Sequence, residues 1–176
     1  MKQVKLLLLI IAFANIFGNC KKTNTTTDEP QLPPETQTGA FTIGFKVDGK
    51  IFTASGKGGL LSDQSVWGGA SNSQASFTIL SSNTTQKFNF SLSVNYNGSL
   101  GINYTSTYPY KGNFQDNSNS TIPGNTNSFE TDSLNVGKVN LKYLSSDIAA
   151  GTFEMKAKNA NGKVIHITEG RFDIGR

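Results

Sequence analysis

The chain has 176 residues and a formal net charge of +4 at pH 7, from 16 Lys and Arg against 12 Asp and Glu. So small an excess argues against a nucleic-acid partner, which needs basic residues clustered on one face. One cysteine excludes an internal disulfide, and one histidine falls short of the several ligands that a metal site normally combines, so we expect no metal and no cofactor.

The first twenty residues have the pattern of a bacterial export signal. Two lysines precede an apolar run over residues 6–17, which is too short to span a bilayer and ends just before Cys20. The stretch resembles the lipobox of bacterial lipoproteins, in which the cysteine is acylated after cleavage. The resemblance implies a signal peptide over residues 1–19 and a membrane anchor through a lipid on Cys20. Without an aspartate beside that cysteine we expect the outer membrane, with the cell surface and the periplasmic face both open. An ordinary secretory signal is the alternative.

A disordered tether is predicted to follow the anchor. Residues 21–39 contain one aliphatic side chain, Leu32, among prolines, threonines and acids. Such a stretch cannot bury enough apolar surface to offset the entropy lost on ordering. We therefore assign the lipidated cysteine and the linker to residues 20–40, and the folded domain to residues 41–176.

The folded domain is predicted to open with a β-hairpin. Apolar and polar residues alternate from Phe41 to Val47, as in a half-buried strand. Asp48-Gly49 then forms a two-residue loop that places Phe45 opposite Phe52. Further strands are expected over residues 66–70, 75–79 and 88–94, with turns at 71–73 and 82–85. Residues 113–127 are expected to form a long loop, either flexible or functional.

The last third of the chain gives the clearest pattern. Alternation predicts strands over residues 139–143, 153–157 and 164–168. A three-residue loop, 160–162, pairs Met155 with Ile167, whereas a two-residue loop would mix the buried and exposed faces. The apolar parity changes after Ile167, which predicts a β-bulge near Glu169-Gly170. With no helical stripe anywhere, the fold class is all-β, a single antiparallel β-sandwich or barrel-like domain of about nine or ten strands.

Both ends of the domain resemble an uncharacterised family of small Bacteroidota lipoproteins. Residues 151–155 (GTFEM) and 167–173 (ITEGRFD) resemble the family's end, and residues 45–50 (FKVDGK) resemble its opening. The resemblance implies the fold and the envelope location. It supplies no catalytic residue, since the family has no established activity. A ligand site that differs between relatives is expected in residues 60–127, outside the resemblance.

The residue pattern offers little for catalysis, and we expect that the protein is not an enzyme. His166 is predicted to face outward across from Lys156, and no serine or cysteine nucleophile has a paired base. A paired-carboxylate hydrolase is the alternative, although solvated charges on a sheet are the simpler interpretation. The carboxylates concerned are Asp147, Glu154, Glu169 and Asp173.

Aromatic residues favour noncovalent binding instead. Trp67 is followed by two glycines, and tyrosines stand among Asn-rich turns, which resembles the aromatic platforms of sugar-binding sandwiches. Closing the rim of the core is the alternative role for such rings. We predict a monomeric binding module for a glycan or an envelope protein, with a purely structural lipoprotein as the other possibility. The candidate ligand-binding residues are Trp67, Tyr96, Tyr104, Tyr108 and Tyr110.

Overall fold

The computed structural model of the chain describes residues 30–58, 62–71, 76–96, 98–105, 110–118 and 127–175. These residues form eleven β-strands and no α-helix, which confirms the all-β prediction and slightly exceeds the predicted strand number. In the described part of the chain, no helix is long and apolar enough to cross a membrane. The strands are β1 (Thr42–Val47), β2 (Lys50–Ser55), β3 (Gln64–Ser71), β4 (Ser76–Asn83), β5 (Phe88–Asn95), β6 (Gly101–Thr105), β7 (Gly112–Asp116), β8 (Ser128–Glu130), β9 (Gly137–Leu144), β10 (Ile148–Lys158) and β11 (Val164–Gly175).

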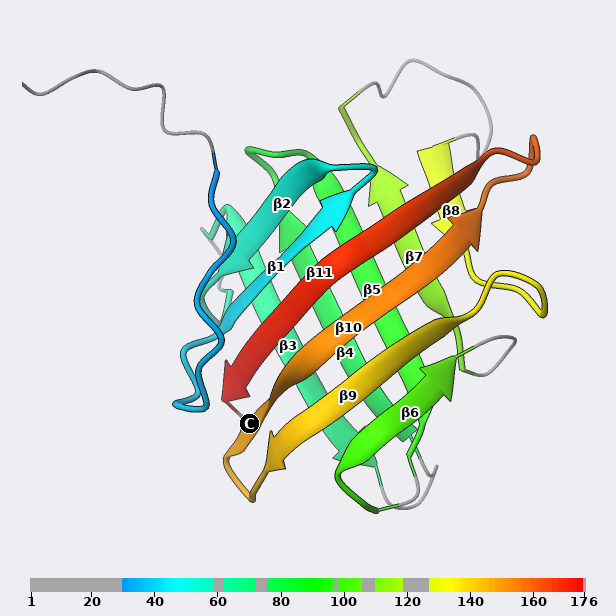
Figure 1. The fold of residues 1–176 in the computed structure, drawn as a ribbon. Helices are drawn as coiled ribbons and strands as arrows, with labels where there is room; N and C mark the ends of the chain where they lie inside the picture. The colour runs from blue at the N-terminus through cyan, green and yellow to red at the C-terminus, as the bar shows by residue number, and fades with distance from the viewer. Residues whose placement is uncertain are drawn as a thin grey trace, which may run out of the picture.

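The strands form two layers that cross each other at an angle (Figure 1). The front layer contains, side by side, β2, β1, β11, β10, β9 and β6, and the rear layer contains β3, β4, β5, β7 and β8. Neighbouring strands run antiparallel throughout. This arrangement is the predicted sandwich or barrel-like domain.

The layers are joined along one side and nearly joined along the other. β10 is long enough to pair with β9 through residues 149–155 and with β8 at Lys158. On the other side, Gly56 O after β2 accepts a hydrogen bond from Val66 N of β3 at 2.8 Å. Next to it, Gln86 Oε1 accepts a hydrogen bond at 2.7 Å from a backbone N–H of β2. One sheet therefore curves almost into a closed barrel.

Phenylalanine rings fill the space between the layers. The ring of Phe45 on β1 lies 4.8 Å from that of Phe90 on β5 and 5.8 Å from that of Phe153 on β10, measured between ring centroids. All three side chains are buried. Because β1 and β5 belong to opposite layers, the contact between Phe45 and Phe90 holds the layers together across the core.

The first hairpin confirms the sequence prediction. Val47 pairs with Lys50 and Phe45 with Phe52, so the loop is Asp48-Gly49. Both loop residues have positive φ, 48° and 90°, as the tight two-residue turn of a twisted hairpin requires. The register therefore places Phe45 and Phe52 on the same, buried face.

The C-terminal hairpin and its bulge are also confirmed. Met155 pairs with Ile167 and Ala157 with Ile165. Beyond the ends of the two strands, Asn159 N donates a hydrogen bond to Lys163 O at 3.0 Å, which leaves residues 160–162 as the loop. The partners of β11 then shift by one residue on both of its sides, toward β10 and toward β1. The extra residue lies at the predicted position, where Glu169 has a φ of 52°. The bulge turns Phe172 inward and restores the buried face after the change of parity.

In the middle of the chain, the structure extends the predicted strands and corrects one loop. β3 and β5 contain the strands expected over residues 66–70 and 88–94, and β9 contains the strand expected over 139–143. β4 contains residues 76–79 of the strand expected over 75–79, whose first residue lies outside the described residues. The long loop predicted from residue 113 is wrong at its start, because β7 occupies Gly112–Asp116 and pairs with β5. Residues 119–126 of that loop lie outside the described residues.

The tether prediction is wrong for residues 30–40. This N-terminal segment lies along the outer face of the front layer (Figure 1), where Pro33 contacts the position of Gly44. Thr36, Thr38 and Gly39 of this segment donate hydrogen bonds to the carboxylate of Asp173. The Asp173 side chain faces outward on β11 but is only 1% exposed. Residues 30–40 show no alternation of apolar and polar side chains, and the bonds join residues more than 130 positions apart. Residues 20–29 of the predicted tether lie outside the described residues.

Candidate functional site

The predicted aromatic residues do not gather at one place. Trp67 on β3 is 59% exposed and Tyr104 on β6 is 61% exposed, but these strands belong to opposite layers. Tyr96 is only 6% exposed and belongs to the core. Tyr110 is half-buried, and its carbonyl accepts a hydrogen bond from the Thr105 hydroxyl.

Two of the predicted site residues cannot be placed. Tyr108, the remaining candidate for ligand binding, and Cys20, the predicted lipid attachment site, lie outside the described residues. Lipidation of Cys20 therefore stays a prediction from the sequence.

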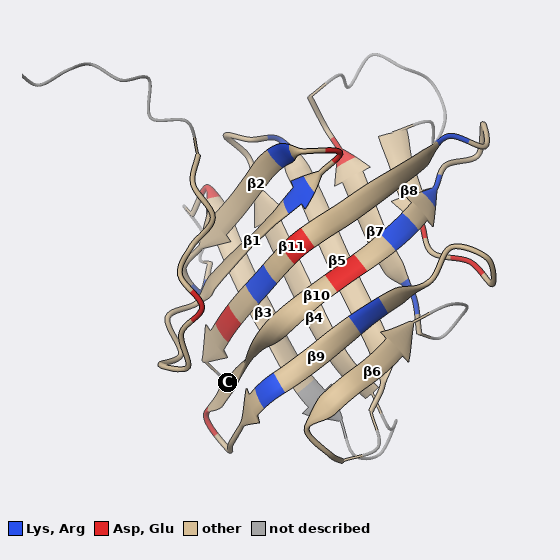
Figure 2. Cartoon of the chain, in the orientation of Figure 1, with Lys and Arg blue, Asp and Glu red and all other residues tan. Residues whose placement is uncertain are grey.

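Trp67 lies among three rear-layer strands that carry no ionisable side chain. β3, β4 and β5 contain no Asp, Glu, Lys or Arg, and in Figure 2 they carry no blue or red. Trp67 pairs with Leu80, which is 40% exposed, so two apolar side chains lie next to each other on this surface. We call the exposed and half-buried outward side chains of these strands the neutral face; they are Ser65, Trp67, Thr78, Leu80, Ser82, Asn89, Ser91, Ser93 and Asn95.

Hydroxyl and amide groups of the neutral face form ladders across the strands. Ser65 and Ser82 hydroxyls lie 2.8 Å apart, and those of Thr78 and Ser93 lie 3.1 Å apart. On the adjoining strands, Asn113 Nδ2 donates to Ser128 Oγ at 2.9 Å. Each hydroxyl has both a donor and two acceptor positions, so these pairs retain capacity for a further partner. The rear layer thus offers fixed polar groups next to an exposed indole.

Unlike the neutral face, the outer face of the front layer carries many charged side chains. Figure 2 shows lysines, arginine and acids distributed over β1, β9, β10 and β11. Cross-strand ion pairs join Lys46 to Glu169 at 2.6 Å and Lys138 to Glu154 at 2.9 Å. The Glu154 carboxylate, through this hydrogen bond, raises the pKa of Lys138. The two faces of the sandwich therefore differ in the charge that they present.

A groove of about 320 Å³ lies on the charged face next to Tyr104. Leu134 and Val136, from the connection between β8 and β9, form its apolar part with the Tyr104 ring. Lys156 and His166 contribute polar groups and form a cross-strand pair, as the sequence predicted for His166. We call this hollow the Tyr104 groove. Sequence analysis missed it, because Leu134 and Lys156 are 22 positions apart and carry no recognisable motif.

Two of the four acids considered for hydrolysis share one open hollow, and neither of them is buried. Glu154 and Glu169 line a hollow of about 230 Å³ together with Glu35. Each of these acids is ion-paired with a lysine. The hydrogen bond from the Lys142 ammonium lowers the pKa of Glu35, the opposite of what a general acid needs. Asp147 is exposed in the turn before β10. Of the four acids, only Asp173 departs from the expected solvated charge, because its side chain is buried.

A third hollow, of about 500 Å³, opens at the ends of the strands over Phe52 and Phe129. Polar atoms at its rim accept hydrogen bonds from the backbone near the turns. Asp48 Oδ1 accepts a hydrogen bond from His166 N at 2.9 Å, and Asn159 Oδ1 accepts one from Lys163 N at 2.9 Å. In the described part of the chain, no group of three or more His, Cys, Asp or Glu side chains is placed to hold a metal ion.

Comparisons with protein-family models, with curated proteins and with solved structures find no match for this chain.

Proposed function

We propose that the chain is a lipid-anchored envelope protein of the outer membrane that binds a neutral glycan noncovalently through its neutral face. The observation that carries the binding proposal is the exposed Trp67 indole beside Leu80, on strands without any ionisable side chain. These three strands offer no charge to attract an ionic partner.

The row that begins at Trp67 has the chemistry of a sugar-binding strip. Successive strands place Leu80, Ser91 and Asn113 in register with Trp67. Neighbouring strands are about 4.8 Å apart, so three steps cover about 14 Å. The apolar end suits the C–H face of a sugar ring, and the hydroxyl and amide end suits its hydroxyl groups. A linear neutral polysaccharide lying across the strands would contact all four side chains.

The anchoring part of the proposal rests on the N-terminal sequence. A basic start, a short apolar run and a single cysteine at its end favour acylation at Cys20. Several acyl chains would hold the domain at the membrane essentially permanently, because each buried methylene contributes about 0.8 kcal/mol. The proposed module would then act only on ligands that reach the envelope.

The binding proposal is tested by pull-down of the purified chain on insoluble neutral polysaccharides, namely cellulose, chitin and a β-1,3-glucan. Trp67→Ala is compared with Tyr143→Ala, an exposed aromatic residue of the front layer. Neither side chain is buried, so circular dichroism should show both variants folded. For the polysaccharide that binds, we expect Trp67→Ala to weaken binding about tenfold, as loss of an aromatic hot spot does, and Tyr143→Ala to leave it unchanged. Equal binding by the two variants, or no retention on any of the three matrices, would contradict the proposal.

A further inference from the structure

The Tyr104 groove combines an apolar part with polar groups in one open hollow. Tyr104, Leu134 and Val136 are 61, 85 and 46% exposed, so three apolar side chains face solvent together. Its volume, about 320 Å³, is at the lower end for small-molecule sites and suits one or two sugar rings. An acyl chain would need an enclosed apolar pocket instead. The mixed lining therefore fits a ligand with an apolar face and polar edges.

Charge distinguishes Lys156 of this groove from the other lysines of β9 and β10, each of which is ion-paired. Lys138 is ion-paired with Glu154 at 2.9 Å and Lys158 with Asp132 at 3.0 Å. Among the residues that the structure describes, Lys156 has no carboxylate within ion-pair distance of its ammonium group. Glu154 also lines the groove, but its carboxylate is paired with Lys138, so Lys156 contributes a cation without an ion-pair partner of its own.

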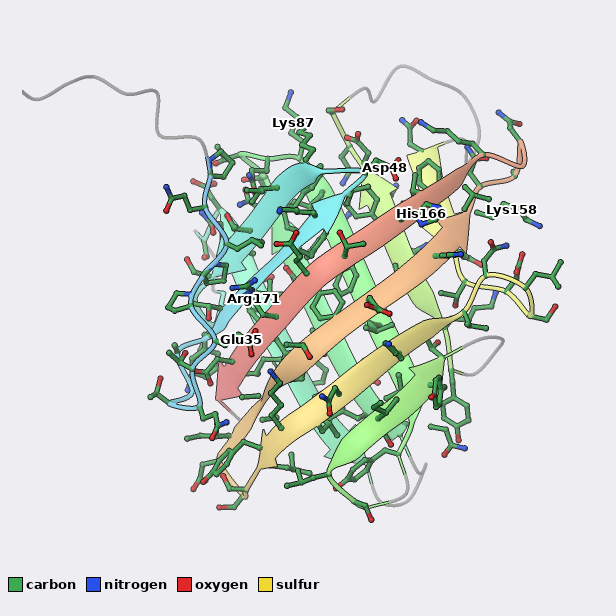
Figure 3. All side chains as sticks on the ribbon, viewed as in Figure 1. Glu35, Asp48, Lys87, Lys158, His166 and Arg171 are labelled. Carbon is green, nitrogen blue, oxygen red and sulfur yellow. The ribbon has the colours of Figure 1, made fainter. Side chains whose placement is uncertain are left out.

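The backbone fixes Lys156 between the apolar part of the groove and a histidine. Lys156 N donates a hydrogen bond to Val136 O at 3.1 Å, which places the lysine beside the apolar part. On its other side Lys156 pairs with His166 of β11, whose side chain Figure 3 shows on the outer face of the front layer. Two nitrogen donors therefore lie next to each other at the polar edge of the groove.

We propose that the Tyr104 groove binds an acidic sugar of the hexuronic acid type. The ring of the sugar rests on Tyr104 through its C–H face, and its carboxylate accepts a hydrogen bond from the Lys156 ammonium. His166 lies beside the same carboxylate. The groove lies on the front layer and the neutral face on the rear layer, so this site goes beyond the proposed function and does not depend on it.

The test uses isothermal titration calorimetry of the purified chain with a trisaccharide of galacturonic acid and with its methyl ester. Esterification removes the negative charge and leaves the rings unchanged. The variants are Lys156→Gln and, as a matched control, Lys158→Gln, which lies on the same strand and face but belongs to the pair with Asp132. We expect the acid to bind the unmodified chain about five- to tenfold more tightly than the ester, the gain of one charge-assisted hydrogen bond.

Lys156→Gln should abolish this preference, while Lys158→Gln should keep it, and a Tyr104→Ala variant should weaken both probes. Equal affinity of the unmodified chain for acid and ester would overturn the proposal. The same conclusion would follow if Lys156→Gln and Lys158→Gln behaved alike, or if neither trisaccharide bound at millimolar concentration. Trp67→Ala should bind both trisaccharides normally, so a failure here and a failure of the neutral-face proposal give different results.

Discussion

Asp173→Asn should release the N-terminal segment from the sheet. The carboxylate accepts four hydrogen bonds from that segment: Thr36 Oγ1 at 2.6 Å, Thr38 N at 2.9 Å and Thr38 Oγ1 at 3.1 Å reach Oδ2, and Gly39 N at 2.7 Å reaches Oδ1. Two of the donors are backbone N–H groups, and these cannot reverse their polarity. An asparagine places its NH₂ group against one of them, whichever way the amide is turned.

The size of the effect follows from that mismatch. One buried N–H group loses its acceptor, at a cost of about 1–3 kcal/mol, and the remaining bonds lose the assistance of the negative charge. We expect a total loss of about 2–3 kcal/mol in the docking of the segment. Thr36→Val is the control, because valine has the shape of threonine but lacks the hydroxyl donor. This change should cost only about 1 kcal/mol.

Amide hydrogen exchange measures the loss where it occurs. A loss of 2–3 kcal/mol should speed exchange at the Thr38 and Gly39 amides by about 30- to 150-fold in Asp173→Asn, against about fivefold at the Thr38 and Gly39 amides in Thr36→Val. Amides of the central strands should change much less. Unchanged exchange at Thr38 and Gly39 in Asp173→Asn would refute the idea that this carboxylate holds the segment.

The same residue predicts a pH dependence. Burial alone would raise the pKa of Asp173, but the bonds from Thr36, Thr38 and Gly39 outweigh it and hold the pKa below its usual range. Its stabilising effect is therefore complete above the unfolded-state pKa of about 4 and is lost as the pH falls through the lower folded-state value. In urea unfolding, the difference in free energy between the unmodified chain and Asp173→Asn should shrink from pH 7 to pH 3. A constant difference would contradict the lowered pKa.

Three further changes test other parts of the structure. Ser81 Oγ is buried without a hydrogen-bond partner among the described residues. Ser81→Ala should therefore raise the free energy of urea unfolding by about 0.5–1 kcal/mol. A lower free energy of unfolding would show that the hydroxyl does form a hydrogen bond. Gly170→Ala should lower the free energy of urea unfolding by about 2–3 kcal/mol, because the new Cβ would lie 2.5 Å from Phe153 O. Gly162→Ala, at a φ of +82° but in open space, should lower it by only about 1 kcal/mol. Equal losses would argue against that close packing at the bulge. Cys20→Ala should move the protein from the membrane fraction to the soluble fraction of lysed cells, and retention in the membrane would refute the lipid anchor.

Sequence alone predicted the hairpins because local signals agreed with one another. The Asp48-Gly49 turn and the alternation around it specify the same register, and the parity change after Ile167 requires one extra residue near Glu169. A one-residue slip would have exposed a whole apolar face, so only one pairing is consistent with burial. Such regions are predictable from neighbours in the chain.

The candidate site was less predictable, for two different reasons. Tyr96 continues the even-numbered buried set of β5, which runs through Leu92 and Val94, so its burial was available from the parity. Trp67 had no such guide, since the glycines that follow it have no side chain to show which face is buried. Its exposure depends on pairing with β4, and the Tyr104 groove depends on strands brought together from distant parts of the chain.

The docked N-terminal segment would place the two faces of the sandwich differently with respect to the proposed membrane anchor. Arg171 Nη1 donates to Pro33 O at 3.4 Å and Glu35 pairs with Lys142, so the chain enters the domain across the charged face of the front layer (Figure 3). If Cys20 bears the lipid, about nine residues separate it from residue 30, which limits their separation to about 30–35 Å. A tether that short, fixed to the front layer, would keep that layer's edge near the membrane and leave the neutral face of the rear layer turned toward ligands. With such an anchor, loss of the Asp173 bonds would lengthen the tether by up to ten residues and remove this orientation, and the carboxylate would link anchoring to presentation.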